Sequence, residues 1–301
     1  MGRTCNGGCV LDRGIAVGSA LSKLYSMIFM NRIDDHAELN NLRAKGQGAF
    51  RRGRGGMDIV FILLHCIQAS KARRRPLYAA FIDLKKAYDS VVWSLLWKCL
   101  EGCGIHGDCL KSLKDMYTGS VLRVRLGGMV GEPFPTRVGV RQGDPLSPLL
   151  FGLFIDRLEA FLQTTVSGCG VLVAGRLLQV LLFADDLVLM AETPQELQLL
   201  LDALCLFCRA NGLTVNTRKT EVVVFNKQQG IPNAEFRYNG DKLIISEQFL
   251  YLGLLFDSAK GIVTAPDKLV SKGKRALWAL VRRCYALGIE RARMHDYLYH
   301  T

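Results

Sequence analysis

The 301-residue sequence predicts an α+β fold in which one sheet packs against helices on one face. The main evidence is the order of the segments along the chain, which is β-α, β-hairpin, α, β-hairpin, α, β. A doubly wound sheet would alternate single strands and helices throughout. With 50% hydrophobic and 22% charged residues, the chain also has the composition of a globular protein, which excludes a disordered tail or a fibre.

The first segments are two helices, a loop and a strand. Mixed spacings of three and four between apolar residues predict a helix over 15–46, and a second helix follows at Met57–Ala72. The glycine- and arginine-rich loop Gly46–Gly56 connects them. After Pro76, the apolar run Tyr78–Asp83 predicts a short buried strand that ends in a carboxylate.

The middle of the chain contains a helix and a hairpin. Asp89 or Ser90 can cap a helix that runs to Glu101 and stops at Gly102. Alternating apolar and basic residues predict a hairpin over Val121–Val140, with its turn at Gly127-Gly128.

The remaining segments have clear start and stop signals. Ser147-Pro148 begins an apolar helix that runs to Leu162, and Thr193–Glu196 is a capping box for a helix that ends at Asn211-Gly212. Apolar runs predict the remaining strands, which are Val180–Ala184, Leu187–Met190, Val222–Phe225 and Phe249–Phe256. A helical tail is expected from Asp267.

The charge is strongly basic and unevenly distributed. Lys and Arg number 39 against 27 Asp and Glu, which gives a net charge of +12. The excess is concentrated in Arg43–Arg75 and Lys260–Arg293. Two basic regions on either side of a less basic centre favour a polyanion as partner, and nucleic acid first of all. A solvated basic surface is the alternative.

The sequence gives no sign of membrane insertion or export. No stretch reaches the roughly 18 uncharged apolar residues of a spanning helix, and Lys23 interrupts the nearest one, Gly14–Met30. Cys205 and Cys208 form a C-x-x-C inside a helical pattern, without a second pair at zinc-ligand spacing. We therefore expect a soluble intracellular chain whose cysteines are reduced and mostly buried.

Three aspartates are the most informative residues. Asp185 and Asp186 lie between two apolar strands, where a two-residue hairpin turn is predicted. Asp83 ends another strand, so the three carboxylates would converge at one edge of the sheet if these strands are neighbours. Carboxylates are the hard ligands that Mg²⁺ prefers, and a pair of such ions suits in-line phosphoryl displacement. An acidic surface turn without a metal remains the alternative.

Six segments resemble the motifs of a known family and follow one another in the same order as those motifs. The segments are Gln47–Arg54, Phe81–Asp89 (FIDLKKAYD), Arg141–Pro148 (RQGDPLSP), Phe183–Asp186 (FADD), Asn216–Glu221 (NTRKTE) and Tyr251–Gly253 (YLG). They resemble the motifs of the reverse transcriptase domain of non-LTR (LINE-type) retrotransposons. The resemblance implies a right-hand polymerase whose palm has an antiparallel sheet packed on helices. It places fingers at 1–76, the palm with a fingers insertion at 77–257, and the start of a truncated thumb at 258–301.

The resemblance also implies a catalytic set. Asp83, Asp185 and Asp186 would bind two Mg²⁺ ions, for which Mn²⁺ can substitute, and the Leu84 carbonyl would be an additional ligand. Lys219 would donate a proton or charge to the departing pyrophosphate. A solvated loop lysine is the alternative for Lys219.

Further roles concern the nucleotide and the nucleic acid. Tyr88 would close over the sugar and exclude a 2′-hydroxyl, although a plain core aromatic is the alternative. Gln142 and Gly143 would lie against the incoming nucleotide and the template, and Arg54 would bind the triphosphate. The residues implied in nucleic-acid binding are Arg51, Arg52, Arg141, Lys272, Lys274 and Arg275. Ala49 departs from the family pattern, which has glycine at that position.

The expected function is RNA-directed synthesis of DNA, with an RNA template, a DNA primer and deoxynucleoside triphosphates as partners. An endonuclease module is expected elsewhere in the element, and the nucleus is the expected location. The alternatives are a retroelement remnant that only binds nucleic acid and an intron-maturase-like protein that assists RNA splicing. An RNA-templated RNA polymerase is disfavoured because the Tyr88 ring would reject ribonucleotides.

Overall fold

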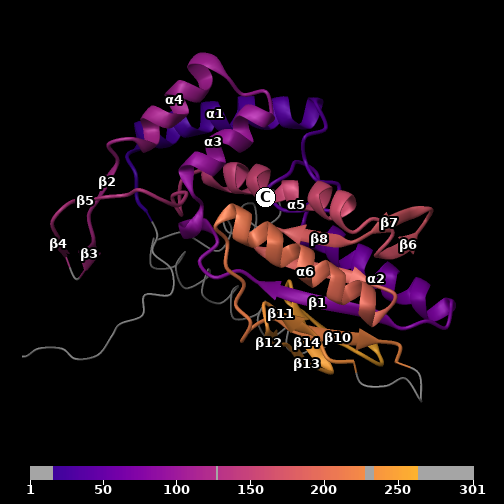
Figure 1. Ribbon diagram of the computed structural model, residues 1–301. Coiled ribbons are helices and arrows are strands. Elements are labelled where there is room, and N and C mark those ends of the chain that lie inside the picture. The colour runs from indigo at the N-terminus through magenta and orange to yellow at the C-terminus, as the bar shows by residue number, and fades with distance from the viewer. Residues whose placement is uncertain (1–15, 127, 228–233, 264–301) are drawn as a thin grey trace, which may run out of the picture.

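The computed structural model describes residues 16–126, 128–227 and 234–263 (Figure 1). Its helices are α1 (Ala20–Leu39), α2 (Gly56–Ala72), the 3-10 helix η1 (Tyr88–Ser90), α3 (Trp93–Gly102), α4 (Gly107–Tyr117), α5 (Ser147–Thr165) and α6 (Pro194–Asn211). The expected helical tail from Asp267 lies outside the described residues.

The strands form one main sheet and several small ones. The strands are β1 (Leu77–Asp83), β2 (Val121–Leu122), β3 (Arg125–Leu126), β4 (Met129–Val130), β5 (Phe134–Pro135), β6 (Val171–Val173), β7 (Arg176–Leu178), β8 (Val180–Phe183), β9 (Asp186–Ala191), β10 (Glu221–Phe225), β11 (Arg237–Tyr238), β12 (Asp241–Lys242), β13 (Ile244–Ile245), β14 (Gln248–Tyr251), β15 (Leu254–Asp257) and β16 (Gly261–Val263).

The main sheet has the order β13-β10-β1-β9-β8, with β1 at its centre. Both β9 and β10 pair antiparallel with β1, and β8 pairs antiparallel with β9. A parallel bridge between Gln47 and Leu182 adds the segment before α2 to the free edge of β8. The α+β class expected from the order of segments is confirmed.

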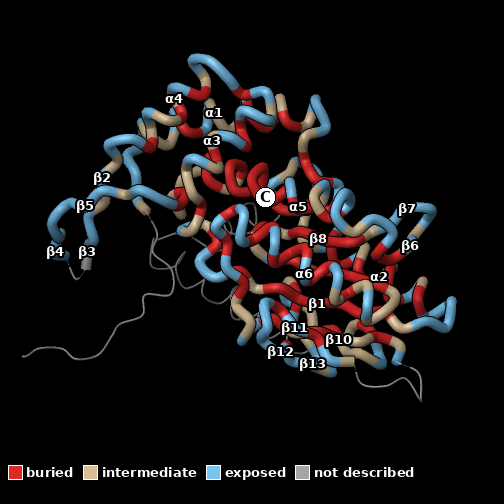
Figure 2. The backbone as a smooth tube through the Cα atoms, in the orientation of Figure 1, coloured by how far each residue is buried: buried red, intermediate tan, exposed pale blue. Residues whose placement is uncertain are grey.

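The two faces of the sheet have different cores. Side chains alternate along a strand, so Tyr78 and Ile82 of β1 pack in the larger core with α3, α5 and α6. Leu77 and Phe81 point to the opposite face, where α2 and the sheet β14-β15-β16 cover them. The expectation that all helices lie on one face of the sheet was wrong. The helix α2 covers the opposite face, where its apolar residues pack against the odd-numbered residues of β1. Figure 2 shows the buried residues concentrated along α5, α6, β8 and β1.

Several helix ends follow their sequence signals. Thr193 caps α6 by accepting the Glu196 N–H (3.2 Å), and Gly212 ends it with a left-handed φ of 68°. The first helix is shorter than the expected 15–46 because Ser19 caps it and the chain leaves the helix at Asn40. None of the helices in the described ranges combines the length and apolar composition that a membrane crossing requires.

Two short hairpins extend from the body of the protein. The hairpin expected over Val121–Val140 is confirmed, since β2 pairs with β5 and β3 with β4 (Figure 1). The hairpin β6-β7 was not expected. Its turn is Ala174-Gly175, where both residues have positive φ values (49° and 73°). The helix α4 was also missed, although its buried Leu110, Leu113 and Tyr117 have the spacing of one face of a helix.

Replacing Gly46 with alanine is expected to destabilise the protein by about 1–3 kcal/mol. A Cβ at Gly46 would lie 2.7 Å from the carbonyl oxygen of Val180, a backbone atom that cannot turn away as a flexible side chain can. The Gly46 carbonyl accepts the Leu182 N–H at 3.0 Å, so the two segments cannot separate without losing a hydrogen bond. Urea unfolding measures the effect. Gly102→Ala is the control, because a Cβ there meets nothing within 4 Å; equal stabilities of the two variants would contradict the prediction.

Candidate active site

Asp83 and the two neighbouring aspartates meet at the end of the main sheet. In the β1-β9 ladder, Asp83 is the direct partner of Asp186. In the β8-β9 ladder, Phe183 is the partner of Asp186, so the two-residue turn consists of Ala184 and Asp185. The expected turn was Asp185-Asp186; instead Asp186 begins β9, and Ala184 takes the left-handed φ (59°) that the turn requires.

Asp83 is held by the loop after α6. The Asn216 side-chain amide donates to Asp83 Oδ2 at 2.9 Å, and the Asn216 N–H donates to the Asp83 carbonyl at 2.7 Å. The Asp83 N–H in turn donates to Oγ1 of the buried Thr220 at 3.2 Å. Asn216 and Thr220 were identified only as parts of a motif, and the amide of the one and the hydroxyl of the other were the signal for this positioning role.

The expected nucleotide site is a cleft of about 900 Å³ beside these aspartates. Its lining includes eight of the expected site residues, namely Asp83, Leu84, Tyr88, Arg141, Gln142, Gly143, Asp185 and Lys219. Asp186 is exposed and lies toward Tyr251, whose pKa is raised by burial and next by the Asp186 charge. The structure thus brings Asp83 and Asp185 to one cleft, whereas Asp186, the ladder partner of Asp83, is not part of its lining.

The donor chemistry of the cleft suits a divalent cation. Asp83 and Asp185 supply hard carboxylate oxygens. Leu84 forms an antiparallel bridge with Val215, whose hydrogen bonds are made by Asp83 and Lys85. The Leu84 carbonyl therefore points away from Val215. Within the described residues, no three or more His, Cys, Asp or Glu side chains form a group that could hold a metal ion. Asp83, Asp185 and the Leu84 carbonyl are the expected donors in the cleft, and Asp89 is a further carboxylate in its lining.

Three of the four residues expected to contact the nucleotide line the same cleft, namely Tyr88, Gln142 and Gly143. The half-buried ring of Tyr88 stacks on Phe151, with ring centroids 4.5 Å apart. The Gln142 side chain donates to Asp89 at 3.4 Å, and Gly143 has a φ of 103° that favours glycine. Lys219 is exposed.

Several expected nucleic-acid contacts are already engaged within the protein. Arg51 makes two hydrogen bonds to the Glu38 carboxylate (2.7 and 2.6 Å), which lower the pKa of Glu38. The Arg141 guanidinium donates to the Met116 carbonyl and lies over the Tyr117 ring. For these arginines, binding of nucleic acid stays a prediction.

The other basic positions differ in their surroundings. Arg52 is mostly exposed and pairs with Asp34 and Asp35. Arg54 donates to the carbonyls of Lys45 and Gln47 and does not line the cleft. Lys272, Lys274 and Arg275 lie outside the described residues.

Sequence comparisons connect the chain with retrotransposon proteins. Residues 11–256 match the family described as reverse transcriptase (RNA-dependent DNA polymerase). The chain is 29% identical over 252 residues to the Pol polyprotein of the type-1 retrotransposable element R2 of Popillia japonica, covering 81% of this chain and 35% of that protein. It is 31% identical over 252 residues to the R2DM Pol polyprotein of Drosophila melanogaster, covering 81% and 23%.

A third relative and the solved structures agree with this. The chain is 28% identical over 284 residues to the probable RNA-directed DNA polymerase from transposon BS of Drosophila melanogaster, covering 91% and 29%. The chain thus spans about a third or less of the length of these relatives.

Apo telomerase of Candida tropicalis has a TM-score of 0.55 at 13% identity, covering 79% of this chain and 44% of that one. Telomerase of Candida albicans, in complex with a telomeric RNA fragment, has a TM-score of 0.54 at 13% identity, covering 81% and 40%. At this identity the likeness shows the fold, and the expected right-hand polymerase architecture is confirmed.

Proposed function

The chain belongs to the reverse transcriptase (RNA-dependent DNA polymerase) family, and from this premise we propose that it copies RNA into DNA as the polymerase part of a non-LTR retrotransposon protein. The observation that carries the proposal is the arrangement of Asp83 and Asp185. Asp83 ends β1, and Asp185 lies in the turn between β8 and β9 of the same sheet. Both line one cleft together with Tyr88, Gln142 and Gly143.

The proposed reaction is nucleotidyl transfer to a primer. The primer 3′-oxygen forms a bond to the α-phosphorus of a deoxynucleoside triphosphate, the bond from that phosphorus to the bridging oxygen breaks, and pyrophosphate leaves while the hydroxyl proton is lost. Asp83 and Asp185, with the Leu84 carbonyl and Asp186, are the residues that would hold Mg²⁺ (two ions, with Mn²⁺ as a substitute). Bound metal would activate the hydroxyl and neutralise phosphate charge. Lys219, exposed in the cleft, would donate a proton or charge to the pyrophosphate.

The partners and organisation are part of the same proposal. The substrates are an RNA template, a DNA primer and deoxynucleoside triphosphates. Fingers correspond to 1–76, the palm to 77–257 and the start of the thumb to 258–301. The endonuclease module belongs to another part of the element, and the site of action is the nucleus.

The direct test is incorporation of dTTP on poly(rA) primed with oligo(dT), with Mg²⁺ or Mn²⁺ and with excess EDTA as the metal-free comparison. Incorporation that depends on the metal supports the proposal. Salt-dependent RNA binding without any incorporation would support the remnant that only binds nucleic acid. Incorporation of UTP in preference to dTTP would point to an RNA polymerase.

Replacing Tyr88 with valine is expected to raise the use of ribonucleotides relative to deoxyribonucleotides by about 10- to 100-fold. The smaller side chain would leave room for a 2′-hydroxyl in the cleft that Tyr88 lines. The measurement is the ratio of kcat/KM for dTTP and UTP. Tyr88→Phe is the control because it keeps the ring and its stacking on Phe151. An unchanged ratio in the valine variant would remove Tyr88 from the sugar-selecting role.

A further inference from the structure

The segment before α2 runs beside the strand that leads to the active-site turn. The Gly48 N–H donates to the Leu182 carbonyl at 2.9 Å, and the Leu182 N–H donates to the Gly46 carbonyl at 3.0 Å. Between these two glycines, the side chain of Gln47 is buried under the sheet edge, facing α5. The segment therefore brings one polar side chain to a site that water does not reach.

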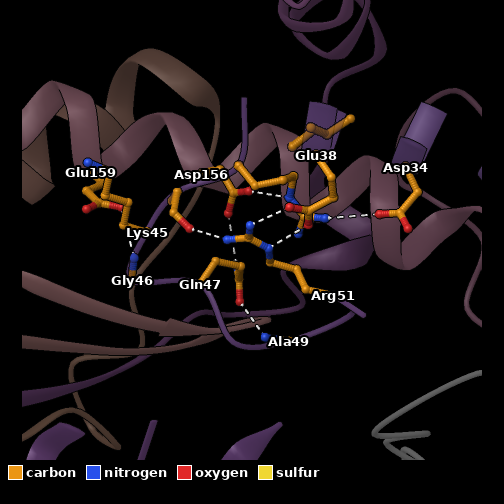
Figure 3. Close-up of polar contacts among 12 residues, drawn as sticks. Asp34, Glu38, Lys45, Gly46, Gln47, Ala49, Arg51, Asp156 and Glu159 are labelled. Carbon is orange, nitrogen blue, oxygen red and sulfur yellow. Dashed lines mark hydrogen bonds and ion pairs between the residues drawn. The ribbon is translucent and has the colours of Figure 1, made fainter. Parts of the chain in front are cut away.

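The amide of Gln47 joins two distant parts of the protein. Its Oε1 accepts the N–H of Ala49 at 2.9 Å and the N–H of Ala184 at 3.3 Å. Its Nε2 donates to Asp156 Oδ1 of α5 at 3.0 Å. Figure 3 shows Gln47 between Asp156 and Ala49. The donors and acceptor around the amide fix which end is oxygen and which is nitrogen.

A buried ion pair fixes Asp156 in turn. Its second oxygen accepts from Arg43 Nε at 2.7 Å, and both side chains are almost fully buried. Asp34 lies 3.8 Å from the Arg43 guanidinium as a second carboxylate. Gly152 of α5 makes room for the guanidinium, because a Cβ there would lie 2.8 Å from Arg43 Nη2. The ion pair thus holds one oxygen of Asp156, and the other oxygen accepts from Gln47.

The residue that Gln47 holds is the strained member of the turn. Ala184 has a φ of 59°, a conformation that alanine disfavours, and it directly precedes Asp185. The hydrogen bond from the Ala184 N–H to the buried Gln47 side chain favours this conformation. The direction in which the Asp185 carboxylate projects depends on that conformation, because the two residues share one turn.

We propose that Gln47 is a positioning residue for Asp185: Arg43 and Asp156 orient its amide, and its carbonyl oxygen holds the Ala184 N–H so that the Asp185 carboxylate points into the cleft. The inference rests on the proposed function, because the position of Asp185 matters to catalysis only if that carboxylate takes part. It adds a role for residues outside the cleft, which none of the motif-derived roles includes.

The test compares Gln47→Met with Gln179→Met. Methionine keeps the length of glutamine and removes its hydrogen bonds. Gln179 is a matched control, since it is also buried and donates one side-chain hydrogen bond, to Val166 at 2.8 Å, but makes no contact with the turn. Amide hydrogen exchange at Ala184 is expected to be at least about tenfold faster in Gln47→Met and unchanged in Gln179→Met. For dTTP incorporation, kcat is expected to fall about 10- to 100-fold with little change in KM, only in Gln47→Met.

A second variant separates positioning from folding. Gln47→Glu places a carboxylate against Asp156 and is expected to lose activity. The double variant Gln47→Glu with Asp156→Asn makes residue 156 the donor and residue 47 the acceptor, and it is expected to recover part of the activity. The inference would be overturned if Gln47→Met had the same hydrogen-exchange rate at the Ala184 amide and the same kcat as the Gln179→Met control. If the wild-type protein incorporates no nucleotide, the proposed function fails, and the exchange measurement still decides whether Gln47 holds the turn.

Discussion

Replacing Asp185 with asparagine is expected to reduce nucleotide incorporation by at least about a thousandfold. The substitution keeps the shape of the side chain and removes the negative charge that the cleft offers to a divalent cation. Folding should not suffer, because Asp185 lies at a half-buried turn beside Asp83 and Asp186, where loss of one like charge relieves repulsion. Single-nucleotide primer extension at saturating Mg²⁺ measures the loss.

The control for this variant is Asp202→Asn. Asp202 is exposed on α6 and accepts a hydrogen bond from Gln198, so the same chemical change occurs far from the cleft. We expect wild-type incorporation from Asp202→Asn, and wild-type RNA affinity and thermal midpoint from both variants. Full incorporation by Asp185→Asn would refute the catalytic role of the aspartates, and with it the proposed polymerase.

The sheet edge that carries the aspartates could be predicted from sequence because each signal there is local. A carboxylate at the end of an apolar strand, as at Asp83, and a pair between two apolar strands can be recognised without knowing the fold. The condition that these strands are neighbours is met, since β1 and β9 pair directly. The predicted turn, Asp185-Asp186, lies one residue after the observed turn, Ala184-Asp185. Alanine rarely takes a positive φ, so nothing in the sequence indicated that Ala184 belongs to the turn.

The buried network could not be predicted in the same way. Gln47 and Asp156 are 109 residues apart, and Arg43 and Asp156 are 113 apart, so no spacing rule connects them. Arg43 belongs to the basic region that favoured a polyanion, but the structure buries it against carboxylates of α1 and α5. One signal was present: Asp156 directly follows the apolar run 149–155, and a carboxylate that is buried with such a run requires a partner.

Replacing Arg43 with methionine is expected to destabilise the protein by about 3–5 kcal/mol. Methionine fills a similar volume but leaves the Asp156 carboxylate buried without its counter-ion. Burial already raises the pKa of Asp156, and the Arg43 guanidinium opposes that rise, so the variant should raise it further. Urea unfolding at pH 7 measures the loss of stability. Arg52→Met is the control, because Arg52 is 65% exposed and its loss should cost about 0–1 kcal/mol.

The dependence of this loss on pH distinguishes a buried charge from a packing defect. A carboxyl whose folded-state pKa is raised destabilises the folded state at pH values above its unfolded pKa of about 3.9. The cost grows as the pH rises toward the folded pKa and is then constant. The difference between Arg43→Met and wild type should therefore shrink as the pH falls toward 4. A difference that does not change with pH would mean that Arg43 acts through its packing, because the methionine variant differs in shape as well as in charge.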